Sequence, residues 1–398
     1  MSIRWRDAMS HALYGPDGFF VAGSGPADHF RTSVHASPAF ATGLLRLISD
    51  VDSALGHPAR LDVVDVGAGR GELLSSLAGG AAGVSARPLA SEPSSGTARP
   101  SLAERIRFTA VEYADRPENL PEEINWVSEI PDEITGLLIA TEWLDNVPLD
   151  VAVHTAEGWR YVLVDPDSGV ETVGELVKAA DLDWLTTWWP APASPRGADR
   201  DLTGGSTSTD STSGSESGFG AARPAQGSSL TARSRPGCPE TPHSDHRAEI
   251  GRPRDEAWAN AVRKISRGLA LAVDYGHLSG DRPVDGTLTG YRGGRQVPPV
   301  PDGSSDVTAH VAMDSVASAG AAVARCAYSL VPQREALRAL GADGGRPPLS
   351  LAGTDPVGYV RALAAASAVA ELTDPAGLGG HWWLRQPVGI PLGPAVAR

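Results

Sequence analysis

Cysteine is scarce in this chain: its 398 residues include two, Cys238 and Cys326, which lie far apart. Two cysteines can form at most one disulfide, which is too little to hold together a chain of this size, and their spacing is not that of a metal-binding pair. No apolar run approaches the roughly 18 residues of a membrane-spanning helix, and Met1–Arg6 lacks the apolar core of a signal peptide. We therefore expect a cytoplasmic protein with reduced cysteines, no metal site and no segment inserted in a membrane.

Positive charge is also in short supply. The chain has 34 lysines and arginines against 48 aspartates and glutamates, which gives a formal net charge of -14 at pH 7. Such a balance disfavours non-specific binding to nucleic acid, so we expect no nucleic-acid partner. The hydrophobic content of 41% is that of a globular protein, and the length suffices for one large domain or two ordinary ones.

The most informative motif lies in the segment 61–74. An apolar, β-branched run typical of a buried strand ends at Asp65 and its neighbour, and an apolar pattern of helical period begins a few residues later. The turn between them carries Gly67, Gly69 and Gly71. Glycines allow a ligand to approach the backbone, and a helix N-terminus offers unpaired N–H groups. A dinucleotide-binding motif needs a glycine three positions after the second one, where this chain has Glu72. The motif therefore indicates a nucleotide-type cofactor other than a dinucleotide.

Strand and helix patterns alternate along the rest of the chain. We expect strands at 105–112, 136–141 and 269–276, a hairpin at 151–154 and 159–164, and helices at 36–60, 315–328, 333–340 and 356–372. This alternation predicts an α/β fold with a mostly parallel sheet covered by helices on both faces. Ligands bind at the carboxyl ends of such strands, so Asp65, Glu112, the segment 141–145 and Asp274 should meet at one edge.

The composition changes sharply between Pro190 and Pro253, where Gly, Ser, Thr and Pro dominate. Such a segment cannot bury enough apolar surface to offset its ordering entropy, so we predict a disordered insertion over 190–254. Asp255 would then cap the next helix and Gly268 would end it. The expected organisation is a loop and helix closing the cofactor site at 1–60, a core at 61–189, the insertion, and a second core part with C-terminal helices at 255–398.

Two carboxylates compete for one role. Glu112 ends the second expected strand, where a carboxylate can accept hydrogen bonds from both hydroxyls of a ribose. Its offset from the glycines exceeds the usual 20 or so residues, which we attribute to a loop or insertion at 80–101. Glu92 has the more usual offset but follows a poor strand pattern, so the alternative stays open.

Glu142 and Asp145 follow the strand at 136–141 and are three residues apart. One helical turn would place both on the same face, where they could hold a guanidinium or accept a proton. The alternative is a helix cap with a solvated acid. His310, alone in a turn-rich segment, is expected to be a structural histidine.

Taken in order, these segments resemble the MidA family of S-adenosylmethionine-dependent methyltransferases. The matching segments are Tyr14-Gly15, Ala27-Asp28-His29-Phe30-Arg31-Thr32, Asp65 to Gly71, Thr141 to Pro148, Asp274-Tyr275-Gly276, Gly286 to Tyr291 and Asp306 to Val311. The chain departs from the family pattern where His29 is inserted, where Asp65 replaces Glu and where Thr141 replaces Asn.

The resemblance implies a class I, Rossmann-like methyltransferase fold with family-specific additions. Mitochondrial relatives are arginine methyltransferases that assist assembly of respiratory complex I. The implied acceptor is therefore a protein side chain, an arginine guanidinium by preference, and a respiratory complex subunit is an implied partner. The alternatives are a small-molecule methyltransferase and a cofactor-binding assembly factor without catalysis. The implied cofactor-binding residues are Asp65, Gly67, Gly69, Gly71, Glu112 and Thr32, and the implied catalytic residues are Glu142 and Asp145.

Overall fold

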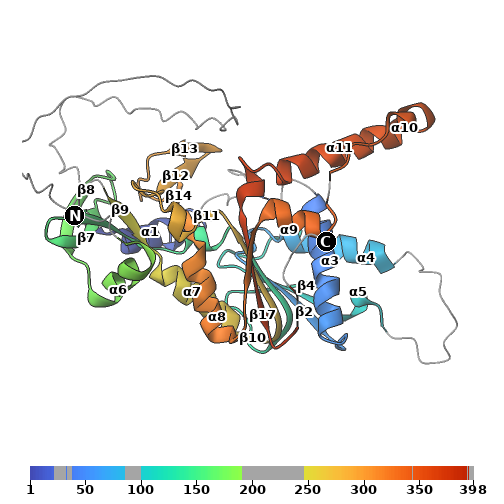
Figure 1. The fold of residues 1–398 in the computed structure, drawn as a ribbon, viewed down its shortest axis with the longest axis horizontal. Coiled ribbons are helices and arrows are strands. Elements are labelled where there is room, and N and C mark those ends of the chain that lie inside the picture. Colours follow the sequence, from blue (N-terminus) through green and yellow to red (C-terminus); the bar gives the residue numbers. More distant parts are fainter. Residues whose placement is uncertain are drawn as a thin grey trace, which may run out of the picture. The chain divides into compact units, whose positions relative to one another are not determined.

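The protein is described by a computed structural model, which covers residues 1–21, 33, 38–85, 100–190, 246–342, 344–391 and 393 (Figure 1). Several sequence expectations fall on residues outside these ranges. They are the matching segment 27–32 with the cofactor contact of Thr32, the part of the expected loop at 86–99 with the alternative ribose ligand Glu92, and the part of the predicted insertion at 191–245.

A mixed sheet forms the centre of the fold. Within the described residues it has seven strands in the order β16-β17-β10-β5-β2-β3-β4. Their bounds are β2 Leu61–Val66, β3 Ile106–Val111, β4 Ile124–Val127, β5 Ile134–Thr141, β10 Ile265–Asp274, β16 Ser329–Pro332 and β17 Trp382–Val388. The strands from β4 to β10 pair in parallel, and β17 and β16 are antiparallel to their neighbours. The carboxyl ends of the five parallel strands β4, β3, β2, β5 and β10 therefore lie along one edge.

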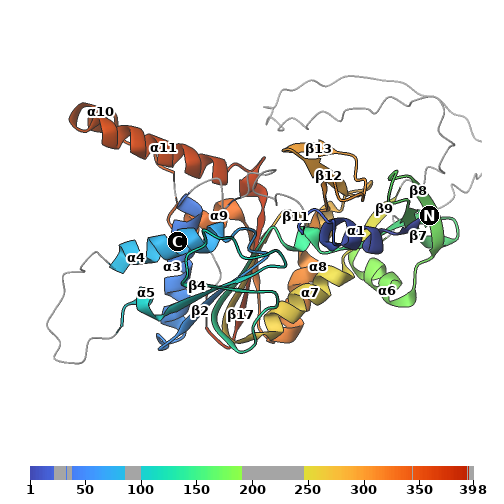
Figure 2. The same ribbon diagram turned by 180° about the vertical axis from the view of Figure 1, so that it is seen from behind.

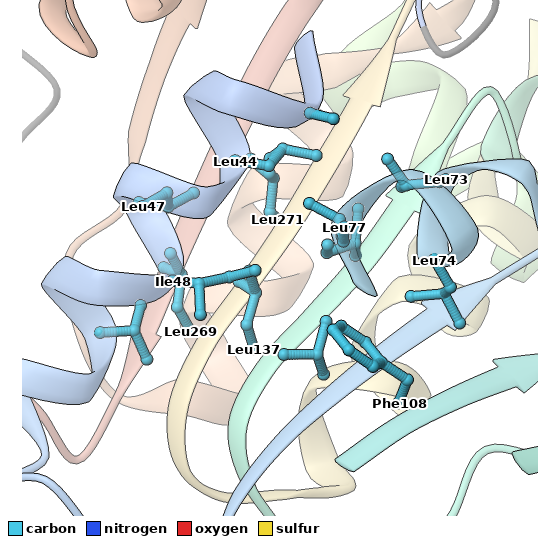
Figure 3. Close-up of a cluster of buried hydrophobic side chains, with 14 of the residues drawn as sticks. Leu44, Leu47, Ile48, Leu73, Leu74, Leu77, Phe108, Leu137, Leu269 and Leu271 are labelled. Carbon is cyan, nitrogen blue, oxygen red and sulfur yellow. The ribbon is translucent and has the colours of Figure 1, made fainter. Parts of the chain in front are cut away.

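Helices cover both faces of this sheet, because its central strands are apolar on both sides. On one side α3 (Pro38–Ala54) and α4 (Glu72–Ser85) pack against Leu137 and Leu269, as the close-up in Figure 3 shows. On the other side α7 (Arg252–Arg263) and α8 (Met313–Ala324) pack against alternate residues such as Leu138. Both ribbon views show this division (Figures 1 and 2).

Smaller sheets lie beside the helices α7 and α8. An antiparallel sheet contains β1 (Ile3–Arg4), β6 (Asp150–Thr155), β7 (Gly158–Val164), β8 (Glu171–Leu176) and β9 (Arg247–Ile250). A second contains β12 (Thr289–Arg292), β13 (Arg295–Val297) and β14 (Asp306–Thr308), and β11 (Gly276–His277) pairs with β15 (Val311–Ala312). The remaining elements are α1 Trp5–Tyr14, α5 Leu102–Arg105, α6 Ala179–Trp188, α9 Gln333–Ala339, α10 Leu349–Thr354, α11 Pro356–Leu372, η2 Leu144–Asn146, η3 Ser279–Asp281 and η4 Leu378–Gly380.

Several elements occur where the sequence predicts them. The hairpin is confirmed as β6 and β7, joined by a turn that pairs Thr155 with Gly158. The helix expected at 356–372 is α11, with the same bounds, because Asp355 caps its first turn through a bond from the Gly358 amide. The helix expected at 36–60 is shorter and ends at Ala54.

The end of the predicted insertion is wrong. Arg247 to Ile250 form β9, and α7 begins at Arg252, with Pro253 in its first turn, rather than at Asp255. Gly268 does not end this helix either. It lies inside β10 opposite Gly136 of β5, where an added Cβ would come within 1.9 Å of the Gly136 carbonyl oxygen. The glycine is required by the close approach of two strands.

Across the described ranges, every helix is too short or too polar to cross a membrane.

Candidate functional site

A cavity of about 1480 Å³ opens at the carboxyl edge of the central sheet. Residues that follow β2, β3, β4 and β5 contribute to its wall, together with parts of α1, β12 and the segment before β17. Among the described lining residues there are eight carboxylic acids against two strong bases, Arg70 and Lys264. The side chain of Lys264 also pairs with Asp132. The wall is therefore strongly acidic.

The glycine turn forms one side of the cavity. Gly67, Gly69 and Gly71 all have positive φ angles, of 72°, 59° and 79°. A Cβ on Gly71 would lie 2.5 Å from Cδ1 of Leu120, and one on Gly67 would lie 3.0 Å from Cδ1 of Trp143. Side chains are excluded here by both conformation and space, which leaves the backbone in front of α4 accessible to a ligand.

Asp65 lies behind this turn, at the end of β2. Its side chain is buried, and its Oδ1 atom has no hydrogen-bond partner among the residues that the structure describes. Burial raises the pKa of this carboxyl to about 8, and the nearby Glu112 and Glu72 add to the rise. A buried carboxyl group without a partner is costly, and a cationic ligand such as an ammonium group would satisfy it.

Glu112 follows β3 and links the end of this strand to the glycine turn. Its Oε2 accepts a hydrogen bond from the Gly69 amide at 3.0 Å, and its Oε1 accepts one from the Tyr113 amide at 2.7 Å. Burial raises the pKa of Glu112, although these backbone bonds act against the rise. Each carboxylate oxygen can accept a second bond, so the group is suited to the pair of ribose hydroxyls predicted for it.

Glu142 comes directly after β5 and also lines the cavity. Its φ angle is 51°, an uncommon left-handed conformation for a residue with a side chain. The conformation is held by a bond from its amide to the Val273 carbonyl, and its Oε1 accepts a bond from the Ser33 amide at 3.3 Å. The expectation of one helical face shared with Asp145 is wrong, because the short helix η2 begins only at Leu144.

Asp145 is buried within η2 at the cavity wall. Its Oδ2 accepts hydrogen bonds from the Tyr275 hydroxyl and, at 2.8 Å, from the Thr308 hydroxyl. Its Oδ1 has no partner within the described part of the chain. Burial raises the pKa of Asp145, and the two hydroxyl bonds oppose the rise. The solvated cap considered from the sequence is therefore excluded.

Two further acids surround this group. Asp274, at the end of β10, does not line the cavity; its Oδ2 accepts bonds from the amides of Leu144 and Asp145 at 3.0 and 3.3 Å. Its role is to hold η2, as a helix cap does. Asp306 does line the cavity, and its Oδ1 accepts a bond from the Asn146 side chain at 2.7 Å. Burial raises the pKa of both acids well above the usual range.

The structure adds residues that the sequence analysis missed. Arg254, assigned there to the insertion, is 1% exposed and donates hydrogen bonds to four backbone carbonyls. These belong to Asp145, Val147, Ala309 and His310. The available signal was Pro253, because proline favours the first turn of a helix. His310 was expected to be a structural histidine. It instead lines the cavity, and its ring contacts the ring of Tyr275.

These residues fit S-adenosylmethionine. The Oδ1 atom of Asp65, which has no partner within the described ranges, suits its ammonium group. The glycine turn leaves room for its methionine part, and Glu112 suits its ribose. No cluster of three or more His, Cys, Asp or Glu side chains within the described ranges is arranged to hold a metal ion.

Comparisons with known proteins agree with this fit. Residues 44–330 match the family described as "Putative S-adenosyl-L-methionine-dependent methyltransferase". A crystal structure of a "likely methyl transferase" from Burkholderia thailandensis, bound to S-adenosyl-homocysteine, aligns with a TM-score of 0.66 and 20% sequence identity. The alignment covers 98% of this chain and 89% of that one.

A native crystal structure of an uncharacterized protein from the same organism and superfamily has a TM-score of 0.64, also at 20% identity, over 100% of this chain and 90% of that one. At this identity the two structures establish the fold. A search of curated protein sequences found no match. The family match spans most of the chain, and the chain therefore belongs to this family of S-adenosyl-L-methionine-dependent methyltransferases.

Proposed function

We propose that the protein is a class I methyltransferase of the MidA type that methylates an arginine side chain of another protein. The observation that carries the proposal is a group of three acids in the wall of the cavity, here called the acceptor wall. Glu142, which directly follows β5, Asp145, which lies in η2, and Asp306, which begins β14, line this wall. Three carboxyl groups at one wall favour a cationic acceptor over a neutral or anionic one.

The shape of the donor set supports arginine in particular. A guanidinium is planar, always charged, and bonds to carboxylates through two parallel N–H groups. Asp145 has one oxygen engaged by Tyr275 and Thr308, and its other oxygen has no hydrogen-bond partner among the described residues. A guanidinium N–H directed at that second oxygen would complete its bonding.

When bound, S-adenosylmethionine supplies a methyl group on a sulfonium, which is already an activated leaving group. The residues of this chain then have three tasks. Asp65, the glycine turn and Glu112 hold the methionine and ribose ends of the cofactor. Glu142 and Asp145 orient the acceptor nitrogen and balance the charge of the guanidinium. Proximity and orientation supply most of the acceleration, which is usual for a transfer between two bound partners.

The acceptor protein belongs to the same proposal. By resemblance to the mitochondrial relatives we propose a respiratory complex subunit, reached in the cytoplasm. The chain's negative charge is compatible with a basic segment of such a partner.

The test is transfer of a labelled methyl group from S-adenosylmethionine in a cell lysate, followed by identification of the labelled residue by mass spectrometry. We expect label on protein, in methylarginine, with the wild-type chain. Glu142→Gln should lower the transfer about 100-fold while S-adenosyl-homocysteine still binds. Label confined to the low-mass fraction would instead indicate a small-molecule acceptor, and cofactor binding with no transfer at all would indicate an assembly factor without catalysis.

A further inference from the structure

His310 lies at the wall of the cavity rather than in the protein core. It lies between β14 and β15, lines the cavity, and keeps part of its surface exposed to solvent. Its ring lies 5.1 Å from the ring of Tyr275, centroid to centroid. The Tyr275 hydroxyl in turn donates to Asp145 at the acceptor wall. The imidazole is therefore next to the proposed acceptor and also in contact with water.

The backbone of His310 is fixed at both of its polar groups. Its amide donates to the Thr287 hydroxyl at 2.8 Å, and this hydroxyl donates to Oε2 of Glu249 at 2.7 Å. Its carbonyl accepts a bond at 2.9 Å from Arg254. Glu249 and Arg254 are 2% and 1% exposed. Two buried charged side chains, from β9 and α7, thus fix the position of one cavity residue. Burying charged groups costs desolvation free energy, so we take the position of His310 to be important for function.

The chemistry of the site calls for such a group. The carboxylates at the wall stabilise the positive charge of a guanidinium, so they also hold its protons more tightly. Methylation of a guanidinium nitrogen forms a carbon–nitrogen bond with the nitrogen's electron pair, while the carbon–sulfur bond breaks and its pair stays on sulfur. The nitrogen must then release one proton. A neutral base in contact with water is suited to accept it.

We propose that His310 is this base: it accepts the proton that the acceptor nitrogen releases and passes it to solvent. Glu249, Thr287 and Arg254 are positioning residues that hold His310 at the wall. The inference rests on the proposed function, since it assumes a guanidinium acceptor.

The surroundings keep the imidazole neutral. Burial lowers the pKa of His310 and the charge of Arg254 adds to the decrease, whereas Glu249 and Asp145 oppose it. The other titratable groups that act on it or feel its charge are Tyr275, His277 and His381. Since the lowering causes prevail, the ring is free to accept a proton at about pH 7.

The test combines kinetics and NMR on the full chain, with the methyl donor saturating and an arginine peptide from the labelled protein as acceptor. In the wild type, kcat/KM should fall at low pH with the same midpoint as the titration of the His310 ring signals, which are identified by their loss in His310→Gln. The ring signals should shift on adding the arginine peptide with S-adenosyl-homocysteine. They should not shift on adding the same peptide with citrulline, the neutral isostere of arginine, at the modified position.

His310→Gln should lower the rate about 100-fold, which is within the usual contribution of a general base. It should also remove the fall in kcat/KM at low pH (the acid limb of the pH profile). Thr287→Val, which removes both hydroxyl bonds, should lower kcat more than it raises KM for the peptide. His154→Gln is the matched control, because this histidine of β6 is outside the cavity lining and packs on Trp159.

An unchanged rate or an unchanged acid limb in His310→Gln would overturn the proposal. So would loss of S-adenosyl-homocysteine binding in both His310→Gln and Thr287→Val, since His310 would then be structural. These results would leave the proposed function standing if the wild type methylates arginine. A wild-type chain that methylates no arginine overturns the proposed function and, with it, the acceptor assigned to His310.

Discussion

At the scale of single residues, the site is built from carboxyl groups held in unfavourable surroundings. Asp65 illustrates the cost: it is buried, one of its oxygens has no partner in the described part of the chain, and its pKa is raised to about 8. The described part of the chain supplies no group that satisfies this oxygen, whereas a bound ammonium group would. Sites of this kind are expected to reduce stability in return for function.

The first prediction concerns the stability of Asp65→Asn. The unfolded chain releases this proton near the ordinary value of 3.8, and the folded chain holds it up to about 8. Between these two values the folded state binds more protons, so the free energy of unfolding falls as pH rises. The Asn variant has no such loss. By thermal denaturation without ligand it should melt about 2–4 °C or more above the wild type at about pH 8, with little difference at about pH 4. A variant that melts below the wild type at both would contradict this.

The second prediction concerns cofactor binding by the same residue. A cationic group beside Asp65 favours the ionised carboxylate, so binding of S-adenosyl-homocysteine at about pH 7 should release a proton. Calorimetry in buffers of different ionisation enthalpy measures this release directly. It should be present in the wild type and absent in Asp65→Asn, whose affinity should also fall about 10-fold or more. Equal proton release in both proteins would exclude Asp65 as the partner of the ammonium group.

At the scale of elements, the parallel strands determine the site by ending at one edge. This is why the sequence already placed Asp65, Glu112, Glu142 and Asp145 together, since each follows an apolar run of strand type. The central strands and α11 could also be predicted from the sequence, because the local periodicity of their apolar residues indicates their secondary structure.

The rest depends on contacts between distant parts of the chain. Arg254 reaches Asp145 across 109 positions, and Tyr275 reaches it across 130. Local patterns carry no information on such pairs, and the polar character of 251–256 made the start of α7 look like the end of a low-complexity segment. The prediction for Gly268 was wrong for a related reason. The local pattern indicated the end of a helix, whereas the glycine is required because the backbone of the neighbouring strand β5 lies so close.

The third prediction concerns the glycine turn. Gly71→Ala places a Cβ 2.5 Å from Leu120 at a φ of 79°, so it should destabilise the chain by about 1–2 kcal/mol and weaken S-adenosyl-homocysteine binding. The matched control is Gly79→Ala in α4, where the added Cβ meets nothing within 4 Å. That change should stabilise the helix by up to about 1 kcal/mol and leave binding unchanged. Chemical denaturation and calorimetry check both; equal effects of the two changes would contradict the role of the turn.

The fourth prediction concerns the connection between α7 and η2. Arg254→Lys retains the charge but cannot reach four carbonyl oxygens, so we expect a loss of about 1–3 kcal/mol in unfolding free energy and a lower kcat. Arg263→Lys, at the exposed end of the same helix, should change neither. If Arg254→Lys melts and reacts like the wild type, the bonds to the cavity segments do not position the site.

At the scale of the whole molecule, one acidic cavity lies at the carboxyl edge of the central sheet. Its wall has eight carboxylic acids among the described lining residues, in a chain whose net charge is already -14. The sulfonium of the cofactor and the guanidinium of the proposed acceptor are both cations, so the negative charge of the protein would assist the binding of both. The family match establishes the cofactor class and the two related structures establish the fold, while the acids of the acceptor wall support the proposed acceptor.

The measurement that tests this account most directly compares two peptides that differ only in charge. The methylated sequence identified from the lysate is prepared with arginine and with citrulline, its neutral isostere, at the modified position. The account predicts that kcat/KM for the arginine peptide is about 100-fold higher or more, since the carboxylates of Glu142 and Asp145 lose their partner with citrulline. Equal use of both peptides would contradict it.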